Sequence, residues 1–116
     1  MQFIYYPKCT TCQRAKKYLD SRNIAYTERN IKEEPPTYDE LKKWHIASGM
    51  PLKKFFNTSG MLYRSMELAR KLPEMTEEEQ LQLLSSDGML VKRPIVVKDD
   101  TVLVGFKEAD WEQLYS

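Results

Sequence analysis

The sequence predicts an α/β fold in which an all-helical insert interrupts a mixed four-stranded sheet. Three observations favour it. Residues 3–31 follow a strand, helix, strand pattern, and residues 95–114 follow a strand, strand, helix pattern. The segment between them carries helical patterns only. The predicted order is therefore βαβ, then helices, then ββα.

The first unit begins with an apolar strand over Phe3–Tyr6, which Pro7 and Lys8 end. A helix is expected from Thr10, because its apolar positions recur at helical spacing. A second strand is expected over Ile24–Ile31. Such a βαβ unit predicts two parallel strands joined by a right-handed crossover.

The insert, at about residues 37–87, contains two clear helix starts. Each is a capping-box pattern, in which Thr37 precedes Glu40 and Thr76 precedes Glu79. A short helix is expected over residues 53–56. Proline, glycine and other turn residues mark breaks at Pro35–Pro36, Gly49–Pro51, Asn57–Gly60 and Asp87–Gly88.

The last unit contains two β-branched runs, Ile95–Val97 and Val102–Val104, on either side of Asp99 and Asp100. This pattern is typical of an antiparallel hairpin. A final helix is expected from about Glu108. Strand units on both sides of a helical insert predict helices on both faces of the sheet, which is the thioredoxin-like arrangement.

Length and composition indicate a single domain over residues 1–116, with 41% apolar and 30% charged residues. The 18 basic and 17 acidic side chains nearly cancel, so nothing in the charge suggests direct nucleic-acid binding. No run is apolar enough to span a bilayer, and no secretory signal is visible. We therefore expect a cytoplasmic protein without a membrane partner. In that reducing compartment a cysteine pair is more often catalytic, sensing or metal-binding than structural.

The chemistry is expected at Cys9-Thr10-Thr11-Cys12, which contains the only two cysteines. A Cys-x-x-Cys at a strand-to-helix junction is typical of thiol redox chemistry. Cys9 would lie at the helix N-terminus, where unpaired backbone N–H groups and the helix dipole favour a thiolate. Cys9 is therefore the expected nucleophile. Cys12, one turn deeper, is expected to resolve the mixed disulfide.

Two other interpretations of the pair stay open, and a third is rejected. The pair is half of a zinc site only if other ligands exist, and His45 is the sole further nitrogen or sulfur donor of the usual kind, so no metal is expected. The cysteines are alternatively inert packing residues. A phosphatase loop needs five residues between cysteine and arginine, whereas four separate Cys9 from Arg14.

A second signal is Arg93-Pro94, directly before the strand at Ile95. Proline is tolerated at the start of a strand and can adopt the cis form there. Arg93 would bring a fixed positive charge toward Cys9, to stabilise its thiolate or hold an anionic substrate. The alternative is an ordinary surface arginine. The candidate catalytic residues are Cys9, Cys12 and Arg93, and the candidate substrate-binding residues are Arg93, Pro94, Lys8, Thr10 and Thr11.

These motifs together resemble the arsenate-reductase (ArsC) family, which also contains the Spx-type regulators. The resemblance covers essentially the whole chain and is strongest to the uncharacterised reductase-like branch. It implies a thioredoxin-like fold with a helical insert, Cys9 as the catalytic thiol, and a cis-proline at Pro94 after Arg93. The motifs that carry it are Tyr6–Cys12, Asn30–Pro36, Phe55–Gly60, Asp87–Gly88 and Arg93–Val96.

The departures from the family bear on function. The glutaredoxin-coupled arsenate reductases place three arginines around the catalytic cysteine. Arg93 matches one, but the other two fall near Asn57 and Phe106, and neither is cationic. One arginine in place of three should weaken oxyanion binding, since each charge-assisted hydrogen bond contributes about 1.5–3 kcal/mol. Those reductases also typically lack a cysteine at position 12.

Three functions follow from the residues and the resemblance. The first is a cytoplasmic thiol–disulfide oxidoreductase, an enzyme with no cofactor beyond an external thiol reductant such as glutathione, glutaredoxin or thioredoxin. The second is an Spx-type redox-sensing regulator that binds the RNA polymerase α subunit, although the chain lacks the charged C-terminal extension usual in those regulators. The third is a glutaredoxin-dependent arsenate reductase.

Overall fold

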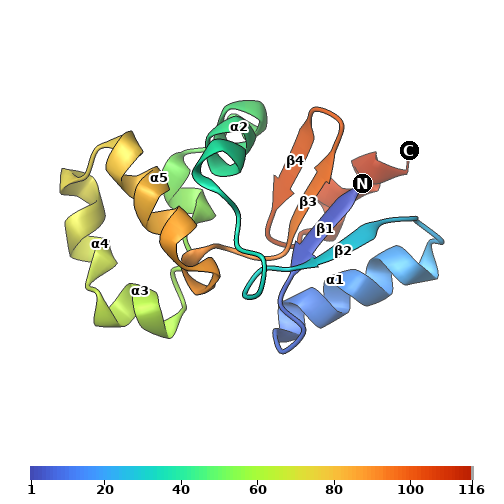
Figure 1. Ribbon diagram of the computed structural model, residues 1–116. Helices are drawn as coiled ribbons and strands as arrows, with labels where there is room; N and C mark the ends of the chain where they lie inside the picture. The colour runs from blue at the N-terminus through green and yellow to red at the C-terminus, as the bar shows by residue number, and fades with distance from the viewer. Residues whose placement is uncertain (116) are drawn as a thin grey trace.

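A four-stranded mixed sheet of order β2-β1-β3-β4 forms the centre of the computed structural model, which describes residues 1–115 (Figure 1). Strand β1 (Gln2–Tyr5) pairs in parallel with β2 (Thr27–Asn30) and antiparallel with β3 (Ile95–Lys98). Strand β4 (Thr101–Val104) pairs antiparallel with β3. The predicted α/β fold, with its parallel first pair and its C-terminal hairpin, is confirmed.

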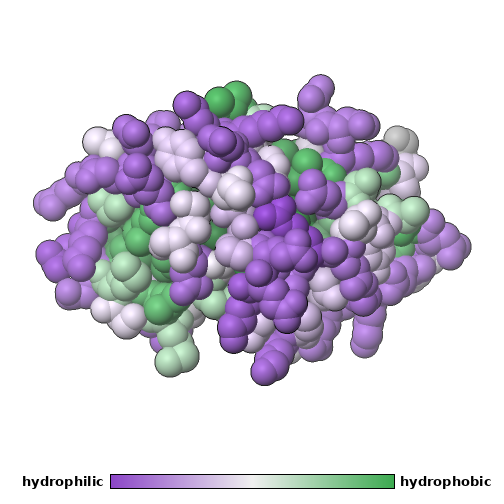
Figure 2. Space-filling view, viewed as in Figure 1, coloured by the Kyte–Doolittle hydropathy of each residue, from purple (hydrophilic) through white to green (hydrophobic). Residues whose placement is uncertain are grey.

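The helices divide into two groups (Figure 1). Helix α1 lies against the sheet, whereas α2 to α5 gather at the end of the molecule away from the two marked termini. No helix within residues 1–115 is both long and apolar enough to cross a membrane. Figure 2 shows hydrophilic residues over most of the face in view. The bounds are α1 Thr10–Ser21, α2 Tyr38–Ser48, α3 Met61–Ser65, α4 Leu68–Lys71, α5 Glu77–Ser86 and α6 Glu108–Trp111. Short 3₁₀ turns span Leu52–Phe55, Leu72–Glu74, Gly88–Leu90 and Glu112–Leu114.

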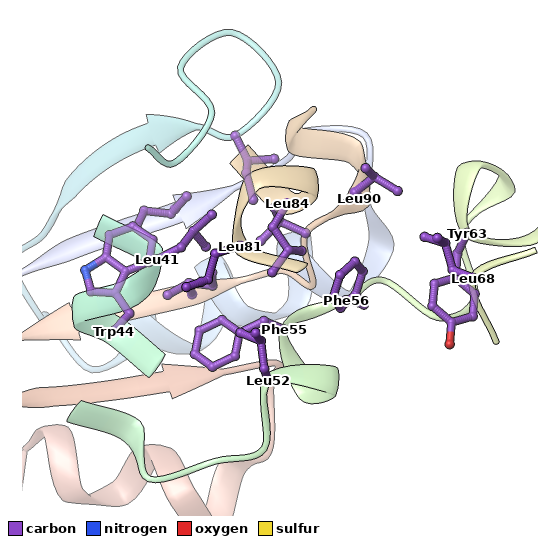
Figure 3. Close-up of a cluster of buried hydrophobic side chains, with 14 of the residues drawn as sticks. Leu41, Trp44, Leu52, Phe55, Phe56, Tyr63, Leu68, Leu81, Leu84 and Leu90 are labelled. Carbon is purple, nitrogen blue, oxygen red and sulfur yellow. The ribbon is translucent and has the colours of Figure 1, made fainter. Parts of the chain in front are cut away.

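Two separate cores cover the two faces of the sheet, because successive side chains of a strand point in opposite directions. Ile4 and Ile95 belong to the larger core, with the apolar side chains of the insert that Figure 3 shows. Phe3 and Val96 belong to the smaller core, with apolar residues of α1 and the fully buried Trp111 of α6. Helices therefore cover both faces, as the sequence predicts.

The start of the insert is fastened to the sheet by an ion pair. Arg29 of β2 donates to both carboxylate oxygens of Glu40, at 2.7 and 2.9 Å. The hydrogen bond from Arg29 lowers the pKa of Glu40 to about 2. Glu40 also accepts from the backbone N–H of Thr37 and so completes the first predicted capping box; the second, Thr76 with Glu79, forms as well.

The end of the insert is fastened by close backbone contact. A β-carbon at Gly88 would lie 1.9 Å from the carbonyl oxygen of Ile31, just after β2, so only glycine fits there. A single antiparallel bridge then joins Phe56 to Val91. The insert is thus held to the sheet at both of its ends.

The structure corrects the predicted elements in two places. Strand β2 is shorter than Ile24–Ile31, because Ile24 and Tyr26 pack against the smaller core before the strand begins at Thr27. Helices α3 and α4 were not expected. Both are too short to show helical periodicity, and neither has a capping side chain at its start.

Candidate functional site

Cys9 lies at the turn between β1 and α1. Its backbone N–H donates to the Tyr6 carbonyl at 3.0 Å, and the Gln13 side chain donates to the Pro7 carbonyl at 2.9 Å, which closes the turn. Cys9 is the N-cap of α1, with extended backbone geometry, and its side chain makes no capping hydrogen bond. The half-buried sulfur therefore remains available beside the helix N-terminus, which favours negative charge.

The surroundings of Cys9 favour its thiolate. Burial raises the pKa of the Cys9 thiol, but favourable interactions of its thiolate with the backbone and thiol of Cys12 and with the positive charge of Arg93 outweigh it. The net effect is a pKa below the ordinary value. A lowered pKa increases the thiolate fraction at neutral pH, and the thiolate is the nucleophilic form of cysteine.

Cys12 has the opposite character. Its side chain is fully buried on the inner face of α1, and both cysteines are free thiols in this structure. Burial and the neighbouring Cys9 sulfur together raise the pKa of Cys12 to about 12. The two neighbouring thiols thus differ sharply in acidity and in access to solvent.

Arg93 lies across the turn from Cys9. Its guanidinium carbon is 5.3 Å from the centre of the Tyr6 ring, and its Nη1 donates a long hydrogen bond of 3.4 Å to the Met89 carbonyl. Its Nε is buried and has no hydrogen-bond partner among the described residues. The peptide bond from Arg93 to Pro94 is cis. Tyr6 packs against the larger core, and its ring also lies beneath this cation.

These residues surround a cavity of about 620 Å³. Of the candidate residues from the sequence, Lys8, Cys9, Thr10, Thr11 and Arg93 line it. Cys12 and Pro94 are buried and do not line it. Their proposed roles in catalysis and substrate binding stay predictions.

The opposite wall of this cavity contains residues that were not among the predicted site residues. Asn57, Ser59, Gly60 and Met61 come from the insert, and the segment 104–107 begins at the last residue of β4. The backbone N–H of Asn57 donates to the Leu90 carbonyl at 2.8 Å, which brings the insert beside Arg93. The resemblance to the arsenate reductases gave one indication of this wall. Asn57 and Phe106, which stand where those reductases have their two other arginines, both line the cavity.

The cavity wall between β4 and α6 contains a glycine with a positive φ. Gly105 has φ of +81°, and its carbonyl accepts from the Trp111 indole at 3.1 Å. A β-carbon there would also press on the Lys92 side chain. Glycine therefore keeps the cavity open at this point.

Comparison with known proteins gives the family. Residues 4–114 match the ArsC family. The chain belongs to the ArsC family. YusI of Bacillus subtilis (strain 168) is 51% identical over 113 residues, which cover 97% of this chain and 96% of YusI. The crystal structure of an ArsC-family-related protein from Bacteroides fragilis is 57% identical, covers 97% of this chain and 95% of that one, and superposes with a TM-score of 0.96.

A transcriptional regulator is a more distant relative. The global transcriptional regulator Spx of Enterococcus faecalis (strain ATCC 700802 / V583) is 29% identical over 102 residues, which cover 88% of this chain and 76% of Spx. These findings confirm the resemblance to the ArsC family and its thioredoxin-like fold.

Proposed function

We propose that the protein is a thiol–disulfide oxidoreductase in which Cys9 is the nucleophile and Cys12 the resolving thiol. One observation carries the proposal, namely the asymmetry of the pair. Cys9 opens into a cavity and has a lowered pKa, whereas Cys12 is fully buried with a pKa of about 12. A thiol that lines the cavity and has a lowered pKa attacks the substrate, and a buried thiol with a raised pKa reacts afterwards within the protein.

The reaction consists of two exchanges. The Cys9 thiolate attacks one sulfur of a substrate disulfide, forms a mixed disulfide and releases the other substrate sulfur as a thiolate. Burial is the main cause of the raised pKa of Cys12, and bonding at Cys9 removes the second cause, the negative charge of the Cys9 thiolate. Cys12 then gives up its proton and attacks Cys9, which closes the Cys9–Cys12 disulfide and releases the second substrate thiol. Two electrons pass from the pair to the substrate.

An external thiol returns the pair to its reduced form. Glutathione, glutaredoxin or thioredoxin is the expected electron donor, and no further cofactor enters the cycle. Such donors are abundant in the reducing cytoplasm, which we propose as the site of action. Arg93 contributes by lowering the pKa of Cys9 and so increasing the fraction of reactive thiolate.

The test is reduction of a chromophoric model disulfide with glutathione or thioredoxin as the electron source. Cys9→Ser should abolish turnover, and Cys12→Ser should accumulate a Cys9 mixed disulfide detectable by mass spectrometry. Arg93→Gln should raise the Cys9 pKa, measured as thiolate absorbance near 240 nm. If Cys9→Ser is as active as the parent, the proposal is wrong.

A second candidate function is redox-dependent binding to the RNA polymerase α subunit. It is favoured by the match to the Spx regulator and by the Cys-x-x-Cys pair. A pull-down with the C-terminal domain of the α subunit, under oxidising and reducing conditions, tests it. No binding in either state would remove this candidate.

Arsenate reduction is the third candidate, favoured by membership of the ArsC family and by Arg93 in the cavity. Asn57 and Phe106 provide no positive charge for an oxyanion, so we expect weak arsenate binding. Arsenate-dependent turnover with glutathione and glutaredoxin would establish this activity.

A further inference from the structure

A second cavity continues the one at Cys9. It has a volume of about 700 Å³ and extends along the insert past Met50 and Phe56. The two cavities share Lys92, Val104 and Lys107 in their walls. The two cavities are therefore adjacent, and we call them together the basic groove, with each cavity as one half. Cys9 lines only the first half, so a ligand that reaches Cys9 and also occupies the second half must be extended.

The groove concentrates positive charge in a chain whose net charge is only +1. None of the acidic side chains in the described residues lines it. The ion pairs found within residues 1–115 involve other basic residues, so none of the described groove cations is in an ion pair with a carboxylate of the protein itself. The basic residues that line the groove are Lys8, Lys53, Lys54, Lys92, Arg93 and Lys107.

One further feature of the Cys9 half indicates a ligand larger than a small disulfide. At its rim, the apolar residue Met61 is 86% exposed. A partner that covers the cavity would bury Met61 and so remove apolar surface from water.

We propose that the basic groove binds an extended acidic segment of a disulfide-bonded protein, with the substrate sulfur at Cys9 and its carboxylates along Lys53, Lys54, Lys92 and Lys107. This rests on the proposed function and names its substrate class, with the electrons transferred as described there. Each residue of an extended chain spans about 3.3–3.6 Å, so a few residues on one side of the substrate cysteine reach the second half. Opposite charges across the groove select this partner and speed its association.

Single-stranded nucleic acid fits the groove less well. Binding of that kind relies on aromatic faces on which bases stack. The aromatic residues of the second half, Phe56 and Tyr63, are only 1% and 6% exposed, so their rings offer no such platform. Acidic protein is therefore the occupant that the groove favours.

The test uses three peptides of equal length, each carrying one disulfide to a chromophoric thiol. Acidic, neutral or basic residues follow the reactive cysteine. We expect kcat/KM to be about tenfold higher for the acidic than for the neutral peptide, and lowest for the basic one. Raising the salt from 0.05 to 0.5 M should remove most of the preference, because salt screens exposed charges.

Variants that remove positive charge show which residues cause the preference for acidic peptides. Lys53→Gln/Lys54→Gln should lower the acidic-to-neutral ratio of kcat/KM about fivefold, from the loss of two exposed charge interactions. Lys42→Gln/Lys43→Gln is the matched control, because it removes an adjacent, exposed lysine pair of α2 that lies outside the groove. It should leave the ratio unchanged.

The outcomes separate this proposal from the proposed function. Binding of a fluorescently labelled acidic peptide to a Cys9→Ser variant, with an affinity that falls as the salt concentration rises, supports the proposed peptide binding in the groove even if no peptide is reduced. Equal rates for the acidic and basic peptides overturn it. The proposal is also overturned if the two double-lysine variants lower the acidic-to-neutral ratio of kcat/KM equally. It is overturned as well if a single-stranded oligonucleotide of equal charge binds more tightly than the acidic peptide.

Discussion

Alkylation with iodoacetamide at pH 7 should modify Cys9 at least about 100-fold faster than Cys12. At this pH a thiol of pKa about 12 is ionised in about one molecule in 100,000, against about three in 100 for an ordinary cysteine. The more basic thiolate is intrinsically more nucleophilic, by about 40-fold over this interval. The two effects leave Cys12 about 100-fold slower than an ordinary thiol, and its complete burial slows it further. The lowered pKa of Cys9 widens the gap.

Mass spectrometry gives the number of labels and their positions. The native protein should take one label, at Cys9, whereas the protein in urea should take two. Cys12→Ser should react natively at the parent rate, and Cys9→Ser should stay unlabelled over the same time. Labelling of the two cysteines within tenfold of one another, or of Cys12 first, would refute the assigned asymmetry and with it the roles of the two thiols.

Three further predictions concern the scaffold and are read from urea unfolding. The lowered pKa of Glu40 limits the contribution of its carboxylate to the free energy of unfolding to about 3 kcal/mol, and solvent screening reduces this contribution. Glu40→Gln should therefore lower the free energy of unfolding by about 1–2 kcal/mol at pH 7, because it weakens the pair with Arg29. Because this carboxylate has a depressed pKa when folded, the difference from the parent should vanish as the pH falls from about 4.5 toward 2; a constant difference would contradict the argument. Gly88→Ala should cost about 3 kcal/mol, since the backbone at Ile31 blocks the added carbon, and an unchanged midpoint would contradict that contact. Trp111→Ala should cost about 3–5 kcal/mol from the smaller core, and a loss below 1 kcal/mol would mean that the core closes around the gap.

The elements that local chemistry determines could be predicted from the sequence. The helix starts at Thr37 and Thr76 are examples, because a capping box satisfies backbone groups within four residues. The hairpin around Asp99 is another, since its turn and alternating strands are adjacent in sequence. Helices α3 and α4 could not be predicted, because contacts with the rest of the insert stabilise segments too short to form alone.

The candidate site also contains a part that local sequence determines and a part that it does not. The position of Cys9 could be predicted, because a strand, a turn and a helix start place it without contacts to distant residues. The proximity of Arg93 required knowledge of how such folds close. The wall formed by Asn57 and its neighbours depends on a backbone contact with Leu90, and no local pattern encodes a pairing between segments so far apart in sequence.

The cavity therefore has two walls of separate origin. The sulfur chemistry belongs to the β1–α1 turn and to the segment before β3, whereas residues 57–61 belong to an insert held in place at Glu40 and Gly88. The groups that lower the pKa of Cys9 and the wall that it faces therefore come from different segments. Replacing residues 57–61 by the corresponding loop of another family member should reshape the cavity and leave the lowered pKa of Cys9 unchanged.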